Sequence, residues 1–248
     1  MKHGIVSVTI IVIILTALSW RLKIQRDISQ EKDMDNPQIA ESYNQYSRSL
    51  ILRLERKLAI NELLKHSLGG ILLDAGCGPG HLDMAVLKVR PELRIIGVDT
   101  SEVMLQIASR NFIGSRHWKR ISFCKGNVQE LPINNNSVEF VISTGSLHHW
   151  LEPGKALGEI YRILKPGGRF LLFDLRRDIP AFLYPLIWLF QKYIMPEAIR
   201  RGNGAIGSIW SSFTPAELEN ILSASLFRNW NLKQSWGWIY IRGKKDDV

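Results

Sequence analysis

Short apolar runs alternate with helix-like segments between Ile71 and Phe173, and this alternation constrains the fold more than any other feature of the chain. Each apolar run has the length of a buried strand, and the segments between them have apolar residues at helical spacing. The predicted strands are Ile71–Ala75, Leu93–Val98, Ile121–Cys124, Val138–Ser143 and Phe170–Phe173. Strands joined through helices predict an α/β fold, with a mainly parallel sheet covered by helices on both faces. Ligands bind such a sheet at the carboxyl ends of its strands.

The last part of the chain is predicted to complete this sheet. A capping box with proline at the first helical position begins at Thr214 and predicts a helix. Two apolar runs divided by Gly237 then predict a closing antiparallel hairpin, Asn231–Trp236 and Trp238–Ile241. With the five strands before it, the hairpin predicts a seven-stranded sheet.

The first twenty residues differ in character from the rest of the chain. Gly4 to Trp20 is free of charged residues. A helix of that length spans about 26 Å, which is just enough to cross the hydrocarbon core of a thin bilayer. Basic residues follow at Arg21, Lys23 and Arg26, which places the remaining chain in the cytoplasm. We therefore predict a transmembrane helix over residues 1–22 as a single-pass membrane anchor, then a linker over 23–37 and one domain over 38–248.

Two other interpretations of the apolar terminus stay open. Ala17-Leu18-Ser19 is similar to the small-x-small site at which signal peptides are cleaved. A buried strand or core helix would also be rich in apolar residues.

Charge and cysteine content narrow the classes of partner. The chain has 32 Lys and Arg against 23 Asp and Glu, a net charge of +9, which favours anionic lipids, nucleic acids or anionic metabolites. With 46% hydrophobic and 22% charged residues, the chain is not a disordered one. Cys77 and Cys124 are too few for a disulfide framework and fit no metal-binding pattern, so we predict no metal and a reducing compartment.

A glycine-rich turn joins the first predicted strand to the helix after it. Gly76, Gly78 and Gly80 allow a tight turn and a close approach of the backbone to a ligand. The helix that follows offers unpaired N–H groups to an anion. Asp99 ends the second strand, where a carboxylate accepts hydrogen bonds from ribose hydroxyls. These residues predict a nucleoside-containing ligand, and the spacing G-x-G-x-G after Asp74 departs from the dinucleotide pattern G-x-G-x-x-G.

Four stretches of the chain, in their order and spacing, resemble a known family. LLDAGCGPG, GVDTS, GNVQELPINNNSVEFVIS and LKPGGRF are similar to motifs of the class I S-adenosylmethionine-dependent methyltransferases, above all the group that includes the ubiquinone and menaquinone methyltransferases. The resemblance covers about Ile39 to Asp174. It implies a Rossmann-like fold, S-adenosyl-L-methionine as cofactor and methyl transfer as activity.

The resemblance also implies which residues bind the cofactor. They follow the ends of the first four strands: Asp74, Gly76, Cys77, Gly78, Gly80, Asp99, Thr100, Asn127, Val128 and Ser143. Asp74 would reach the amino group of the methionine portion, which the turn residues would line. Asp99 would hold the ribose, and Val128 would donate a backbone N–H to adenine. Asn127 stands where the family has Asp, and its amide oxygen can accept the same bond without charge, so we expect weaker binding. Cys77 is read as a small packing residue.

Candidate catalytic residues follow the fourth strand. His148 and His149 are imidazoles at the ligand edge, and either can accept a proton near neutral pH. They can equally cap a turn or pack on the cofactor. Tyr43 and Tyr46 on the first helix either fold over the site, as in relatives, or pack within the helix layer.

The acceptor of the methyl group is expected to contact an insertion over residues 175–213. An apolar, aromatic-rich run within it, Phe182 to Tyr193, is too short to cross a membrane. It suits a cap over an apolar substrate, a segment in the lipid interface with flanking arginines at headgroup level, or a core helix.

The sequence thus predicts a membrane-anchored methyltransferase acting on a small or lipophilic acceptor, such as a quinone precursor or a lipid. Two alternatives are a tethered protein that binds the cofactor without catalysis, and an RNA methyltransferase. Nucleic acid is the less favoured partner because the basic residues are scattered and no RNA-binding module is recognised.

Overall fold

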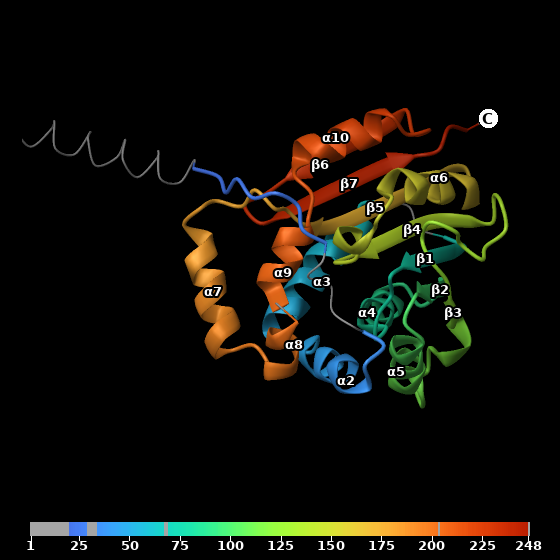
Figure 1. The fold of residues 1–248 in the computed structure, drawn as a ribbon. Coiled ribbons are helices and arrows are strands. Elements are labelled where there is room, and N and C mark those ends of the chain that lie inside the picture. Colours follow the sequence, from blue (N-terminus) through green and yellow to red (C-terminus); the bar gives the residue numbers. More distant parts are fainter. Residues whose placement is uncertain (1–19, 29–33, 67–68, 203, 248) are drawn as a thin grey trace, which may run out of the picture.

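The computed structural model describes residues 20–28, 34–66, 69–202 and 204–247. In this part of the chain, seven strands form one sheet in the order β3-β2-β1-β4-β5-β7-β6 (Figure 1). The strands are β1 Ile71–Ala75, β2 Arg94–Asp99, β3 Ile121–Lys125, β4 Val138–Thr144, β5 Leu164–Leu175, β6 Asn229–Gln234 and β7 Trp238–Lys244.

Helices cover both faces of the sheet, as predicted. They are α2 Pro37–Tyr46, α3 Leu50–Leu63, α4 His81–Val89, α5 Glu102–Phe112, α6 Pro153–Ile163, α7 Leu183–Tyr193, α8 Glu197–Arg201, α9 Gly204–Ser211 and α10 Pro215–Ser223. The turns η1 Trp118–Arg120 and η2 Leu147–His149 are 3-10 helices. In Figure 1, α4 and α5 lie below the sheet and α6 and α10 above it.

Each helix layer packs an apolar face onto the strands. On one side, Val86 of α4 and Phe112 of α5 pack with strand residues such as Ile95. On the other, Ile160 of α6 and Leu222 of α10 pack with the opposite face of the same strands. Because the strands are buried on both faces, they read as continuous apolar runs in the sequence.

The predicted fold class needs two corrections. First, the sheet is mixed and not purely parallel: β7 is antiparallel to both β5 and β6, because the short connection at Ser235–Gly237 turns the chain straight back on itself. β1 to β5 pair in parallel, and β6, on the far side of β7, runs in the same direction as these five strands.

Second, the prediction of a transmembrane helix and a single-pass membrane location is wrong, because none of the helices within the described residues is long and apolar enough to cross a membrane. Residues 1–19 of the predicted anchor lie outside the described residues. Where the description begins, the chain is extended rather than helical, and its peptide groups bond to the domain. Leu22 N–H donates to Ile179 O (3.0 Å) and Asp27 N–H to Trp210 O (3.0 Å).

The chain before β1 forms two helices, α2 and α3. Asn36 caps α2 with its side chain, and the helix ends at Tyr46. Ser47-Arg48-Ser49 separates it from α3, with Ser49 in an extended conformation. Serine side chains compete for backbone hydrogen bonds, which favours a break at this point.

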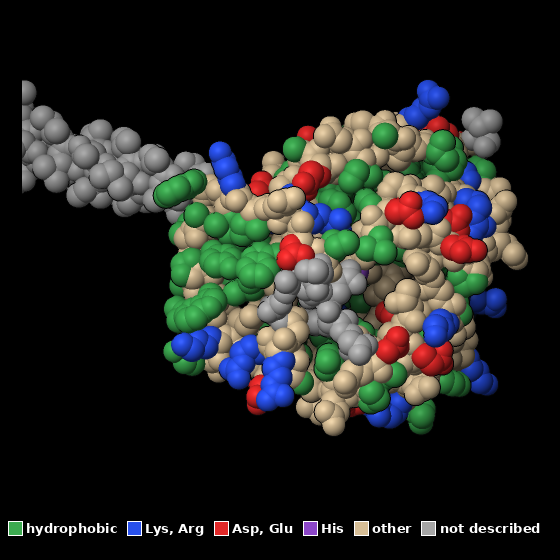
Figure 2. All heavy atoms as spheres, in the orientation of Figure 1, with side chains coloured by type: hydrophobic (Ala, Val, Ile, Leu, Met, Phe, Trp, Pro, Cys, Tyr) green, Lys and Arg blue, Asp and Glu red, His purple; other side chains and the backbone are tan. Residues whose placement is uncertain are grey.

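The insertion over residues 175–213 carries α7, α8 and α9. No residue of α7 is buried, and Leu186, Trp188 and Leu189 are exposed; Figure 2 shows hydrophobic side chains gathered on this side of the molecule. Arg176 and Arg177, by contrast, are buried within the domain, where Arg176 pairs with Asp178.

Candidate functional site

A cavity of about 450 Å³ lies at the carboxyl edge of the parallel strands. Its floor is formed by the ends of β1, β2 and β4 and by the loop after β3, and α2 and α3 contribute the opposite wall. Of the described residues of the insertion 175–213, none lines the cavity. The helices that cover the site are therefore α2 and α3.

The predicted glycine turn after β1 forms one side of this cavity. Gly76, Gly78 and Gly80 all have positive φ, at 82°, 51° and 73°, a region that side chains with a Cβ rarely adopt. A Cβ on Gly76 would lie 2.2 Å from the Ser146 hydroxyl, whereas one on Gly78 would meet nothing within 4 Å. The turn is thus closely packed at Gly76 and open toward the cavity at Gly78.

Asp99 at the end of β2 fixes the geometry of the turn. Its carboxylate accepts hydrogen bonds from Gly78 N–H (2.8 Å) and Ser101 N–H (2.9 Å). Burial raises the pKa of Asp99, although these two N–H groups act in the opposite direction. Asp99 and the adjacent Thr100 both line the cavity.

Two buried carboxyl groups lie behind the turn. Asp74 lines the cavity, and Asp83 on α4 is completely buried next to it. Among the described residues no hydrogen-bond donor pairs with Asp74 Oδ1 or with either oxygen of Asp83. Burial, together with the repulsion of the neighbouring carboxylate for Asp74, raises the pKa of both groups. Such a pair retains a proton and is suited to a cationic group placed in the cavity.

The loop after β3 brings Asn127 and Val128 to the cavity wall. The Asn127 side-chain oxygen accepts Gln129 N–H (2.9 Å), so one of its lone pairs is used within the loop. Cys77 also lines the cavity and is buried. Burial raises the pKa of its thiol well above the usual range, consistent with a packing residue.

Ser143 is not brought to the cavity wall. It is buried in β4, and its hydroxyl donates to Ala75 O (2.6 Å), which ties β4 to β1. The next three residues of the chain, Thr144, Gly145 and Ser146, line the cavity instead.

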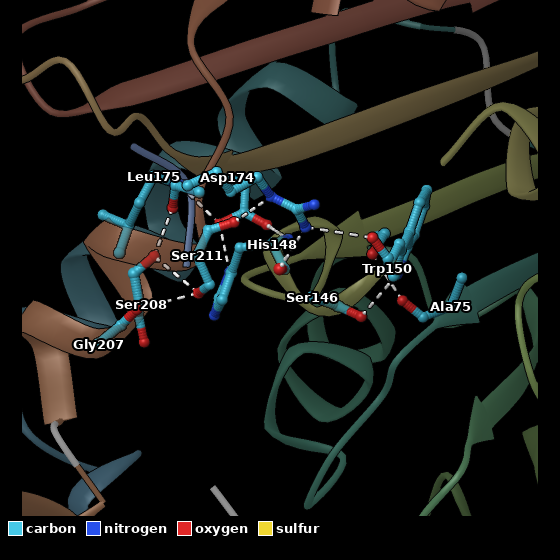
Figure 3. Close-up of polar contacts among 12 residues, drawn as sticks. Ala75, Ser146, His148, Trp150, Asp174, Leu175, Gly207, Ser208 and Ser211 are labelled. Atoms are coloured by element: carbon cyan, nitrogen blue, oxygen red, sulfur yellow. Dashed lines mark hydrogen bonds and ion pairs between the residues drawn. The ribbon is translucent and has the colours of Figure 1, made fainter. Parts of the chain in front are cut away.

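The two histidines have different positions. His148 is buried and absent from the cavity wall; its Nδ1 lies 2.8 Å from Asp174 Oδ1, and its backbone N–H donates to Asp174 Oδ2 (3.0 Å). Figure 3 shows this pair beside Ser208 and Ser211 of α9. Burial alone would raise the pKa of Asp174, but the His148 ring and the hydrogen bonds hold it below its usual value. His149, whose ring centre is 4.0 Å from that of His148, does line the cavity.

The extended segment over residues 20–28 packs against the histidine turn. The Arg26 guanidinium donates to His148 O (3.1 Å) and Trp150 O (3.2 Å). It also donates to Ser211 O (2.7 Å). Residues of the predicted linker therefore help to hold the turn that carries His149.

Asn44, a buried residue of α2, fixes this helix to the glycine turn. Its side-chain oxygen lies 2.9 Å from His81 Nε2 and accepts a hydrogen bond from Asn111 Nδ2 (3.0 Å). Asn111 also donates to Pro79 O (2.9 Å) within the turn. Tyr43 lines the cavity, whereas Tyr46 does not.

Sequence reasoning missed the contribution of α3. Leu52, Glu55 and Arg56 line the cavity, and their spacing places them on one face of the helix. The signal was present in the charged pair Glu55-Arg56 inside a leucine-rich helix, but only the packing of α3 shows that this face points inward.

Comparisons with known proteins agree with this geometry. Residues 73–172 match the family described as "Methyltransferase domain". The chain is 32% identical over 129 residues to a demethylmenaquinone methyltransferase of Symbiobacterium thermophilum, which covers 52% of this chain and 51% of that protein. It is 26% identical over 160 residues to the ubiquinone/menaquinone biosynthesis C-methyltransferase UbiE of Syntrophotalea carbinolica, covering 64% and 67%. The chain thus spans about half to two thirds of the length of these relatives.

The fold is similar to that of a putative S-adenosyl-L-methionine-dependent methyltransferase from Methanococcus maripaludis, with a TM-score of 0.67 and 23% identity. The likeness covers 88% of this chain and 97% of that structure. At this identity the comparison supports the fold, and the sequence matches support the family.

Proposed function

The chain belongs to the S-adenosylmethionine-dependent methyltransferases, and we propose that it transfers the methyl group of S-adenosyl-L-methionine to a small lipophilic acceptor of the hydroquinone type. The observation that carries the proposal is the cavity at the sheet edge, where an open glycine turn lies between the carboxyl groups of Asp74 and Asp99. The names of the relatives, which methylate demethylmenaquinone or act in ubiquinone and menaquinone biosynthesis, support the acceptor class.

The residues on the floor of the cavity suit this cofactor. Asp74, backed by Asp83, offers carboxyl oxygens without donor partners to the ammonium group of the methionine portion. Asp99 retains lone pairs for the ribose hydroxyls beyond the two N–H groups that it already accepts. Asn127 and Val128 line the same cavity and are the residues proposed to hold the adenine.

The apolar side chains that line the cavity suit an apolar acceptor. Leu52, Trp150 and Leu151 line the cavity together with Met34, and such side chains bind an aromatic ring by apolar contact. When bound, S-adenosylmethionine supplies a methyl group already activated by its sulfonium. The chain's own residues have to align the acceptor with that methyl group and keep water away from it.

The test is transfer of radiolabelled methyl from S-adenosylmethionine to a reduced 2-prenyl-1,4-naphthoquinone. We expect label in the quinone product. Calorimetry should show that the donor binds with a Kd of micromolar order, similar to typical KM values of enzymes. In the variant Asp99→Ala, which removes the carboxylate proposed to hold the ribose, we expect weaker binding of the donor. Asp247→Ala, which changes an exposed carboxylate far along the chain, is its matched control. A protein that binds the donor but labels no reduced quinone would contradict the acceptor class, and a protein that does not bind the donor would contradict methyl transfer itself.

A further inference from the structure

Helix α3 exposes several apolar side chains while one of its carboxylates lines the cavity. Leu50, Ile51, Leu54 and Leu58 are exposed, by 66%, 45%, 52% and 42%. The charged side chain of Glu55 points to the cavity instead. Exposing leucines while enclosing a carboxylate costs free energy on both counts. An arrangement of this kind is expected where the carboxylate has a function in the cavity.

Glu55 is available for such a function. In the part of the chain that the structure describes, its carboxylate makes no hydrogen bond and no ion pair, and it is half-buried. The charged and titratable groups that face it are Asp174 of β5, Tyr43 and Tyr46 of α2, Tyr240 of β7 and its neighbour Arg56.

The electrostatic surroundings make this carboxylate basic. Burial, and secondly the negative charge of Asp174, raise the pKa of Glu55 to about 7, and the positive charge of Arg56 offsets only part of the effect. A carboxyl group with this pKa accepts a proton far more readily than a surface glutamate. His149 lines the same cavity, but Glu55 is the carboxylate that lines it from a helix whose leucines are exposed, and this arrangement needs an explanation.

We propose that Glu55 is the residue that binds a hydroxyl of the acceptor and takes its proton during methyl transfer, an inference that rests on the function proposed above. The Glu55 carboxylate accepts the hydrogen bond of a hydroquinone O–H. As the proton passes to Glu55, the electron pair of the O–H bond moves into the ring, and a ring carbon beside the hydroxyl carbon forms a bond to the methyl carbon. The methyl–sulfur bond breaks and its electron pair stays on sulfur.

The remaining steps balance the reaction. The methylated ring carbon loses its hydrogen as a proton and the ring oxygen regains one from Glu55, which restores the hydroquinone. The net products are the methylated hydroquinone, S-adenosylhomocysteine and one proton. No oxidant or reductant takes part.

The experiment compares the wild-type protein with Glu55→Gln, Glu55→Asp and the exposed control Glu219→Gln. The acceptor is reduced 2-prenyl-1,4-naphthoquinone, with labelled S-adenosylmethionine from pH 6 to pH 8. We expect the wild-type rate to rise through about pH 7 and then level off, because Glu55 must be ionised to take the proton. Glu55→Gln should lower kcat by about 100-fold or more and flatten the pH profile, while binding the donor normally. Glu55→Asp should keep the pH dependence at a lower rate, and Glu219→Gln should match the wild type.

A second measurement does not depend on turnover. Binding of the same hydroquinone to the complex with S-adenosylhomocysteine should strengthen about tenfold from pH 6 to pH 8 in the wild type, since an ionised carboxylate accepts a stronger hydrogen bond. It should be independent of pH in Glu55→Gln. The inference is overturned if Glu55→Gln matches the wild type in rate or pH profile, or if wild-type binding does not change with pH. Wild-type binding that follows pH without any transfer of label would refute the proposed function and leave Glu55 as the hydroxyl-binding residue.

Discussion

Removing the Asp99 carboxylate should weaken both the glycine turn and the binding of S-adenosylmethionine. In Asp99→Ala the N–H groups of Gly78 and Ser101 lose their acceptor. A hydrogen bond to a charged group contributes about 1.5–3 kcal/mol. Because burial already raises the pKa of Asp99, part of this gain is spent on enclosing the charge. We therefore expect the two lost bonds together to lower the free energy of unfolding by about 2 kcal/mol.

The effect on binding is separate from the effect on stability. If Asp99 also accepts a ribose hydroxyl, its loss should cost a further 1.5–3 kcal/mol or about 10- to 150-fold in Kd. Asp99→Asn keeps an acceptor oxygen of the same size but loses the charge, so it should fall between Ala and wild type on both measures.

Calorimetric titration with S-adenosylmethionine and urea unfolding of the same preparations distinguish these effects. Binding is compared below the unfolding transition, where each variant is folded, and Asp247→Ala serves as the surface control. The reasoning is refuted if Asp99→Ala binds the donor as tightly as wild type. It is also refuted if the Ala and Asn variants lose equal affinity, because the carboxylate would then act only through the conformation of the turn.

Three further predictions concern the buried groups around the site. Burial raises the pKa of both Asp74 and Asp83, so the folded state retains a proton that the unfolded state loses. The resulting contribution to stability is present below about pH 4 and is lost as pH rises through the raised pKa, which is about 7 for Asp83. Asp83→Asn should therefore gain stability relative to wild type between pH 5 and pH 8 in urea unfolding, and an unchanged difference would contradict a shared proton. His148→Ala should lower the free energy of unfolding by about 3 kcal/mol, since the buried carboxylate of Asp174 loses its imidazole partner. His149→Ala should have the melting temperature of the wild type, and equal losses of stability in the two variants would show that both rings are structural. Gly76→Ala should abolish donor binding, because its φ of 82° is strained for alanine and its Cβ would lie 2.2 Å from a serine hydroxyl; normal binding in calorimetry would show that the turn relaxes.

The sequence was most informative where backbone conformation determines the residue type. The three glycines of the turn need positive φ or a close approach, and Asp99 lies at a strand end, so all four could be placed at one edge from spacing alone. Ser143 could not be placed, because neighbouring residues of a strand point to opposite faces and the register of β4 beside β1 decides which of them meets the ligand.

The cover of the site was harder to predict because it depends on packing between distant segments. The aromatic run in 182–193 fits a substrate cap, a segment in the lipid interface or a core helix by its composition, and the absence of buried residues in α7 argues only against the core helix. The two histidines are adjacent in sequence, but the 3-10 turn η2 sends one ring to Asp174 and the other to the cavity. For such groups, the residue type indicates which chemistry is possible, and only the tertiary contacts show which residue reaches the cavity.

The division between floor and wall determines how far the relatives inform the function of this chain. The methyltransferase family matches residues 73–172, which include the glycine turn, Asp99 and the loop after β3. Leu52, Glu55 and Arg56 lie before that match, yet they form the wall opposite the glycine turn. The two parts are joined through Asn44, whose hydrogen bond to His81 holds α2 against the turn. If α3 helps to select the acceptor, as proposed above, substitutions in α3 should change the acceptor and leave the affinity for S-adenosylmethionine intact.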